Sequence, residues 1–231
     1  MLQLPYATYR PAPVSLADLA PPTGKPRPAG DAIIRLLDLT IAAVALFVLA
    51  PIMLLVSLLI VAGDGASPLF VQQRLGRGGS GFGCLKFRTM IPDAEHRLAL
   101  LLAGNTATLS LWRRDQKLAG DPRITPLGHL LRIASIDELP QLLNVLAGHM
   151  SLVGPRPIVA AEVGRYGRRF ATYCDRRPGI TGLWQVTGRS RAGYDRRLAC
   201  DRLFARRRSV ALYLRILAAT VPAVLLARGA C

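Results

Sequence analysis

The strongest feature of the hydrophobic pattern is an apolar segment from Leu39 to Ala62 that contains no charged residue. As a helix, its 24 residues would be about 36 Å long, enough to cross a bilayer core of about 30 Å. The pattern therefore predicts a membrane helix, and a single transmembrane span is the simplest form of such a helix.

Two features of this segment favour a re-entrant hairpin over a span. Basic residues lie on both sides of it, including Arg35 before and Arg74 after, whereas positive charge usually marks only the cytoplasmic side. Pro51 lies near its midpoint, where a proline removes a backbone hydrogen bond and bends a helix. We predict that the chain enters and leaves the membrane on one face, while a proline-kinked span stays the alternative.

Shorter patterns follow the apolar segment. Ser67–Arg74 and Cys84–Arg88 have the composition of strands, and the glycine-rich stretch Gly76–Gly83 between them predicts a β-hairpin. The spacing of leucines predicts helices over residues 93–103 and 106–118.

The second half of the chain continues this alternation. Apolar residues at helical spacing predict an amphipathic helix over Leu139–Leu146, closed by Gly148. Met150–Val153 and Gly182–Val186 are typical of short strands. The last apolar stretch, Val210–Ala227, carries an arginine and a proline, so we expect it to lie against the membrane surface or the core.

Composition narrows the choice of partner. The chain has 231 residues, 51% of them hydrophobic, and a formal net charge of +16, so it is not a disordered polymer. Such a charge suits nucleic acid, anionic lipids or phosphorylated substrates. The long apolar segment favours membrane lipids, and we expect no nucleic acid. The four cysteines and three histidines lack the spacing of a zinc site, which indicates reduced cytosolic thiols.

Asp137 and Glu138 are the leading candidates for chemistry. One interpretation is structural, because Ser135 and Glu138 have the spacing of a helix capping box. Pro140 fits better if Asp137 is the N-cap, since the proline then falls in the first turn. The two carboxylates would then adjoin a positive helix end, a setting in which an ionised aspartate can attack phosphorus and an adjacent glutamate can hold a divalent cation. Helix capping stays the alternative interpretation.

Two other motifs are candidates for phosphate binding. Prolines on both sides of Arg156 hold it in extended geometry, so its guanidinium is preorganised for a phosphate or simply lies on a rigid turn. Gly76–Gly81 matches G-x-G-x-x-G, but a strand-like segment follows it where a dinucleotide site needs a helix. That glycine motif is therefore read as a hairpin turn.

Taken together, these motifs resemble the bacterial sugar transferase family, the monotopic polyprenyl-phosphate hexose-1-phosphate transferases. The resemblance covers about 200 of the 231 residues and excludes the N-terminal tail. Its motifs follow the family's order, which makes the match specific: Arg35–Asp38, Lys86–Met90, Asp121–Thr125, Ser135–Gln141, Asn144–Leu146, Met150–Pro157 and Pro178–Gly188.

The resemblance implies an activity and a role for each site residue. Asp137 would attack the β-phosphate of a UDP-sugar and expel UMP, after which polyprenyl (undecaprenyl) phosphate would accept the phosphosugar. Glu138 would bind Mg²⁺. Arg132 and Arg156 match phosphate-binding arginines of the family, and Lys86 falls in a motif near the site. The donor sugar stays open.

The resemblance also bears on the membrane segment and has departures. Pro51 matches the proline at which the family's re-entrant helix bends. Ala50 stands where many relatives have serine, so a serine contribution to the bend is absent. Arg206–Arg208 stands where many relatives are more aromatic and less charged, a departure that bears on the local C-terminal packing and on sugar selection.

The expected architecture is α+β and helix-rich. It comprises a proline-rich tail (1–30), a re-entrant membrane helix (31–66), and a cytosolic catalytic domain with short strands and membrane-surface helices (67–231). The expected location is the cytoplasmic face of the bacterial inner membrane. A non-catalytic basic protein that binds anionic lipid or polymer, and a glycosyltransferase that releases UDP, are the competing hypotheses.

Overall fold

The computed structural model describes residues 28–104, 109–110, 112, 118, 120–187 and 193–225. Over these residues the chain is rich in helices and has two small two-stranded sheets, which confirms the predicted helix-rich class. Residues 1–27 of the predicted tail (1–30), most of the predicted helix 106–118 and the last six residues lie outside the described residues. Residues 28–30, predicted as tail, belong to the first helix instead.

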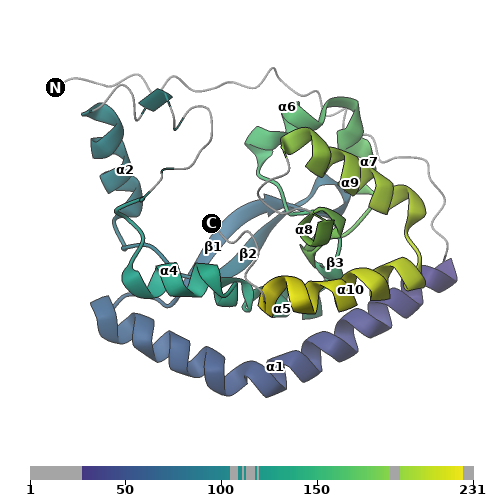
Figure 1. Cartoon of the computed structure of the whole chain (residues 1–231), viewed down its shortest axis with the longest axis horizontal. Helices are drawn as coiled ribbons and strands as arrows, with labels where there is room; N and C mark the ends of the chain where they lie inside the picture. The colour runs from purple at the N-terminus through teal and green to yellow at the C-terminus, as the bar shows by residue number, and fades with distance from the viewer. Residues whose placement is uncertain are drawn as a thin grey trace.

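The apolar segment forms part of one long helix, α1 (Pro28–Asp64), which runs continuously through Pro51. Two helices joined by a turn are therefore not seen. The helix is bent, and its convex side faces away from the other elements (Figure 1). Among the described residues it is the one helix long and apolar enough to cross a membrane. Its direction of entry and exit stays a prediction.

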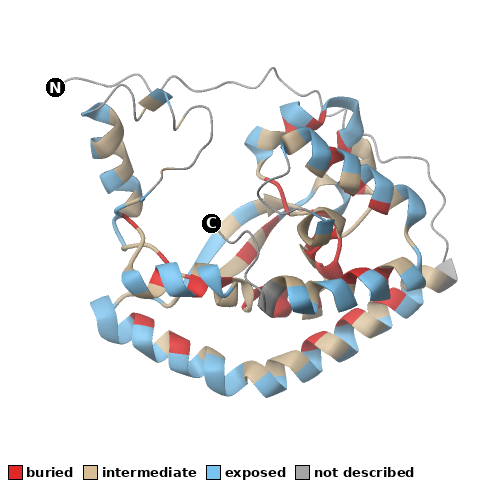
Figure 2. Ribbon diagram, in the orientation of Figure 1, coloured by how far each residue is buried: buried red, intermediate tan, exposed pale blue. Residues whose placement is uncertain are grey.

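Both halves of α1 pack against the remainder of the protein. Ile34 and Ala42 belong to a core cluster that also contains residues of α5 (Gln141–Leu146), α9 (Tyr194–Arg207) and α10 (Val210–Leu225). Val56 and Ile60 belong to another cluster, together with Leu131 of α4. The opposite side of the helix exposes large apolar side chains (Figure 2), including Leu36, Val44, Phe47, Val48, Leu54, Leu55 and Leu58. This face has the composition of a lipid-contacting surface.

A buried carboxylate fixes the first half of α1 to the domain. Asp38 is 1% exposed. Its Oδ1 accepts hydrogen bonds from Ser151 Oγ, Leu152 N and Tyr213 Oη at 2.8–2.9 Å. These bonds satisfy the carboxylate in place of water, as a buried charge requires, and they join α1 to β3 and α10.

The predicted hairpin is confirmed. β1 (Leu69–Leu75) and β2 (Gly81–Phe87) are antiparallel, with Leu69 opposite Phe87 and Leu75 opposite Gly81. A 3-10 turn at Arg77–Gly79 connects them, so the G-x-G-x-x-G sequence is a strand connection, as expected.

The second sheet pairs β3 (Ser151–Val153) with β4 (Gly179–Thr181) in parallel. A Cβ atom on Gly179 would lie 2.0 Å from the Gly154 nitrogen, so the close approach at the end of this pair requires glycine.

The strand predicted at Gly182–Val186 is wrong: the strand ends at Thr181, and α8 (Leu183–Thr187) follows. A short apolar run does not by itself distinguish a strand from one helical turn.

The other helices surround these strands. α4, α5 and α10 follow one another along the inner side of α1 (Figure 1). α2 confirms the helix expected over 93–103, and α5 confirms the one expected over 139–146. The bounds are α2 (Ala94–Ala103), α4 (Pro126–Ile133), α5 (Gln141–Leu146), α6 (Val163–Tyr166), α7 (Phe170–Cys174), α9 (Tyr194–Arg207) and α10 (Val210–Leu225).

One arginine of the basic run at the end of α9, Arg208, has a structural role. Arg208 is ion-paired with Asp31 near the start of α1, and Arg176 lies 3.4 Å from the same carboxylate. Arg206 and Arg207 are exposed. The run therefore ties the α9–α10 connection to the membrane helix.

Candidate active site

Asp137 and Glu138 lie on a 3-10 turn, Ile136–Glu138, between α4 and α5. Ser135 precedes it with φ +57° and makes no side-chain capping bond. α5 begins at Gln141, with Pro140 at its N-cap position. Ser135 occupies the N-cap position of the 3-10 turn without the predicted capping bond, and Asp137 lies inside that turn, so neither residue caps α5 as predicted. The left-handed backbone at Ser135 reverses the chain, and backbone bonds close the turn, including Leu139 N to Ile136 O at 3.1 Å.

Lys86 of β2 brings a cation to both carboxylates. Its Nζ donates to Glu138 Oε1 at 2.6 Å and lies 3.6 Å from Asp137 Oδ2. The side chains of all three are about four-fifths or more buried, so solvent screens these charges weakly. The predicted nucleophile Asp137, the predicted metal ligand Glu138 and the lysine of the neighbouring motif, Lys86, thus form one cluster.

The two carboxyl groups differ in their electrostatics. Burial raises the pKa of Asp137, and the attraction of Lys86 only partly offsets it. Burial also opposes ionisation of Glu138, but Lys86 and Arg156 outweigh it and lower the pKa of that carboxyl. A helix N-terminus was expected to keep Asp137 ionised. Because the residue lies on a turn ahead of α5, its charge depends on nearby cations instead.

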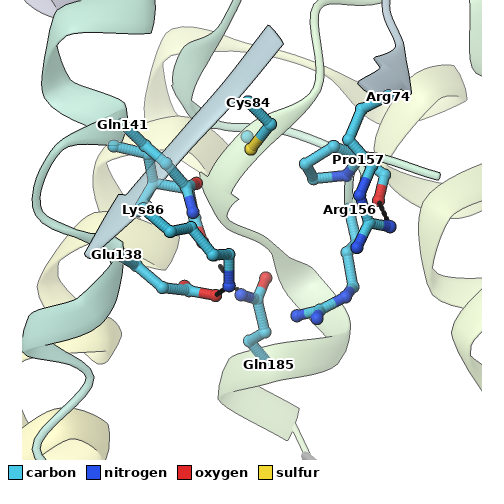
Figure 3. A pocket seen from close by; sticks show the side chains of 10 residues that line it. Arg74, Cys84, Lys86, Glu138, Gln141, Arg156, Pro157 and Gln185 are labelled. Atoms are coloured by element: carbon cyan, nitrogen blue, oxygen red, sulfur yellow. Dashed lines mark hydrogen bonds and ion pairs between the residues drawn. The ribbon is translucent and has the colours of Figure 1, made fainter. Parts of the chain in front are cut away.

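Arg156 faces this cluster across a small cavity (Figure 3). It follows β3, and Pro155 O accepts a hydrogen bond from Gly179 N at 2.8 Å, which anchors its backbone to β4. Its guanidinium lies 5.8 Å from the ring centroid of Trp184, a cation–π distance. The residues lining the cavity are Arg74, Cys84, Lys86, Glu138, Gln141, Arg156, Pro157, Gly179, Ile180 and Gln185.

Arg132 takes a different position. Its Nε donates to Thr89 Oγ1 at 2.9 Å, and its charge acts on Asp137. It is not among the residues that line the cavity. The structure therefore places Arg132 near Asp137 but outside the cavity that Arg156 lines.

Sequence reasoning missed three polar side chains of the cavity: Arg74, Gln141 and Gln185. Gln185 lay in the segment wrongly predicted as a strand. Its Nε2 donates to Ile180 O, and its buried Oε1 has no hydrogen-bond partner among the described residues. That oxygen is available to an N–H or O–H of a ligand.

The fit to Mg²⁺ depends on the substrate. Among the described residues, no group of three or more His, Cys, Asp or Glu side chains converges to hold a metal. Mg²⁺ is commonly held by one or two carboxylates together with substrate phosphates. Glu138, with Asp137 beside it, fits that arrangement if phosphate oxygens complete the shell.

A helix with an exposed apolar face, together with a cavity lined by one carboxylate and three cations, suits an enzyme for phosphorylated substrates at a membrane. The sequence model of the family described as bacterial sugar transferase matches residues 29–227. The chain belongs to this family and is a phosphoglycosyl transferase.

Several curated proteins are similar over most of the chain. The exopolysaccharide production protein ExoY of Sinorhizobium fredii is 44% identical over 90% of this chain and 92% of its own length. The undecaprenyl-phosphate galactose phosphotransferase of Salmonella typhimurium is 41% identical over 85% of this chain and 41% of its own. A UDP-glucose:undecaprenyl-phosphate glucose-1-phosphate transferase of Caulobacter vibrioides is 40% identical over 91% and 76%.

Proposed function

We propose that the protein transfers a sugar-1-phosphate from a UDP-sugar to undecaprenyl phosphate, releases UMP and so initiates exopolysaccharide or other glycan assembly. The observation that carries this proposal is the cluster of Asp137, Glu138 and Lys86, of which Glu138 and Lys86 face Arg156 across one cavity while Asp137 lies 3.6 Å from the same lysine. The named activities of the relatives from Salmonella and Caulobacter support the same reaction.

In the first step a carboxylate oxygen of Asp137 forms a bond to the phosphorus that carries the sugar. The bond from that phosphorus to the bridging oxygen breaks, and its electron pair leaves with UMP. Lys86 and Arg156 hold the charged oxygens, and burial of the site strengthens each contact. The product is a phosphosugar ester of Asp137.

In the second step an oxygen of undecaprenyl phosphate attacks the same phosphorus. The bond to Asp137 breaks, and its electron pair restores the carboxylate. Both substrates thus use one nucleophile in turn, a ping-pong scheme that is typical of covalent catalysis. Mg²⁺, which Glu138 would hold, supplies neutralisation of phosphate charge when bound.

The exposed apolar surface supports a membrane location. Besides the outer face of α1, large side chains are exposed on the three helices that lie along it, including Leu130 of α4, Leu143 of α5 and Leu214 of α10. Helices with such faces lie in the lipid interface. We place them on the cytoplasmic face of the inner membrane, where a soluble UDP-sugar meets a lipid phosphate.

A nucleotide assay tests the proposed reaction. Purified protein in undecaprenyl phosphate micelles should convert a UDP-sugar to UMP, and a screen of UDP-sugars should identify the donor. Release of UDP would instead show transfer of the sugar without its phosphate. Binding to anionic lipid with no nucleotide released from any donor would support the non-catalytic hypothesis.

The topology of α1 is a separate prediction. Cysteines introduced at Lys25 and Arg77, with Cys200 and Cys231 changed to serine, should both react with an impermeant maleimide only after spheroplasts are opened. Both positions flank the apolar segment, so a re-entrant helix leaves them on the cytoplasmic side. Labelling of one position in closed spheroplasts would mean that α1 spans the membrane.

A further inference from the structure

Arg74 adds a third cation to the cavity, on the side of Arg156. It lies in β1, and its side chain is 14% exposed. Figure 3 shows Arg74, Arg156 and Pro157 along one wall and Lys86, Glu138 and Gln141 along the other. The two walls therefore carry cations of different kinds, an ammonium beside the carboxylates and two guanidinium groups opposite.

The guanidinium of Arg74 is held in one orientation. Its Nε and Nη2 donate to Gln72 Oε1, and its Nη1 donates to Pro157 O at 3.0 Å. These bonds within the described residues use three of the five N–H groups of an arginine. A fork fixed in this way loses little further conformational freedom when it binds an anion.

The charge of Arg74 is incompletely balanced. Burial lowers its pKa, and repulsion from Arg156 lowers it further. The carboxylate of Glu162 attracts it from 3.8 Å, beyond hydrogen-bond distance. Three cations and one carboxylate line the cavity, while Asp137 and Glu162 lie near Lys86 and Arg74 without lining it. A phosphate between the walls would accept charge-assisted hydrogen bonds from these cations.

We propose that Arg74 binds the phosphate that departs with the nucleotide, while Lys86 binds the phosphate that Asp137 attacks. This inference rests on the proposed function. Lys86 contacts the reactive carboxylates, so the sugar-bearing phosphate belongs on its wall and the next phosphate of the donor reaches the arginine wall. When the bond to the bridging oxygen breaks, the departing phosphate gains one negative charge, which Arg74 and Arg156 stabilise.

The test compares binding of UMP with binding of uridine by calorimetry on the full-length protein in detergent. Arg74→Gln should weaken UMP binding and lower kcat/KM for the UDP-sugar by about tenfold to a hundredfold, the range for one hydrogen bond to a charged group. Uridine binding should stay unchanged. Arg97→Gln is the matched control, because Arg97 is an exposed arginine of α2 whose ionic partner among the described residues is nearby Asp93.

Arg74→Lys keeps the charge but not the fork, so it should bind UMP several-fold more weakly than the wild type. This variant decides the matter if Arg74→Gln does not fold. Equal UMP affinity in the wild type and the folded Arg74 variant would overturn the inference, as would parallel losses for UMP and uridine, which indicate general distortion. Failure of the wild type to release UMP would instead overturn the proposed function.

Discussion

Asp137→Asn should lower the release of UMP by about three orders of magnitude or more, because removal of a catalytic nucleophile typically has an effect of this size. The amide has nearly the shape of the carboxylate but forms no stable ester with phosphorus. The residue is 8% exposed and lies on a turn closed by backbone bonds, so the fold should persist. UMP release from the UDP-sugar with undecaprenyl phosphate is the measurement.

Two controls make this result specific. Asp93→Asn changes an exposed aspartate of the loop before α2 and should leave turnover unchanged. Wild-type protein mixed with the donor alone should gain the mass of a phosphosugar on the peptide that contains Asp137. Transfer by the Asp137→Asn variant at the wild-type rate, or product without any such adduct, would refute the covalent mechanism.

The parts of the fold that were predictable are those with strong local signals. The apolar segment, the glycine-rich hairpin and the leucine spacing of α5 each depend on neighbouring residues alone. The strand wrongly predicted at Gly182–Val186 shows where local signals fail. The position of β4 is determined by its parallel pairing with β3, whose residues lie 28 positions earlier in the chain. Ser135 gave no sign of its left-handed backbone, since such a conformation is uncommon outside glycine.

The site was predictable as a set of candidates and not as a geometry. Glu138 and Lys86 are 52 residues apart, and only the folded chain shows that they share a hydrogen bond. The same holds for Arg74, which in the sequence is one more polar residue of a half-buried strand. The resemblance indicated which residues to expect in the reaction, whereas burial and distance show which of them form charged pairs.

Glu138→Gln should have the second largest effect, a loss of about a hundredfold in transfer. Breaking a buried ion pair by removing one partner costs about 3–5 kcal/mol of stability, and here the change removes the negative charge that Lys86 contacts at 2.6 Å. The charged partner that Lys86 keeps among the described residues is the carboxylate of Asp137, at 3.6 Å. A closer ammonium would stabilise the charged form of Asp137 and weaken it as a nucleophile. Initial rates of UMP release as a function of Mg²⁺ are the measurement.

The Mg²⁺ dependence separates two roles of Glu138. If Glu138 holds the metal, the Mg²⁺ concentration for half-maximal rate should rise in Glu138→Gln and stay near the wild-type value in Lys86→Met. If Glu138 acts only by holding Lys86, the double variant should be no slower than Lys86→Met, since contacting residues are not additive. An unchanged Mg²⁺ requirement in Glu138→Gln would therefore exclude the metal role and leave the ion pair as the reason for the carboxylate.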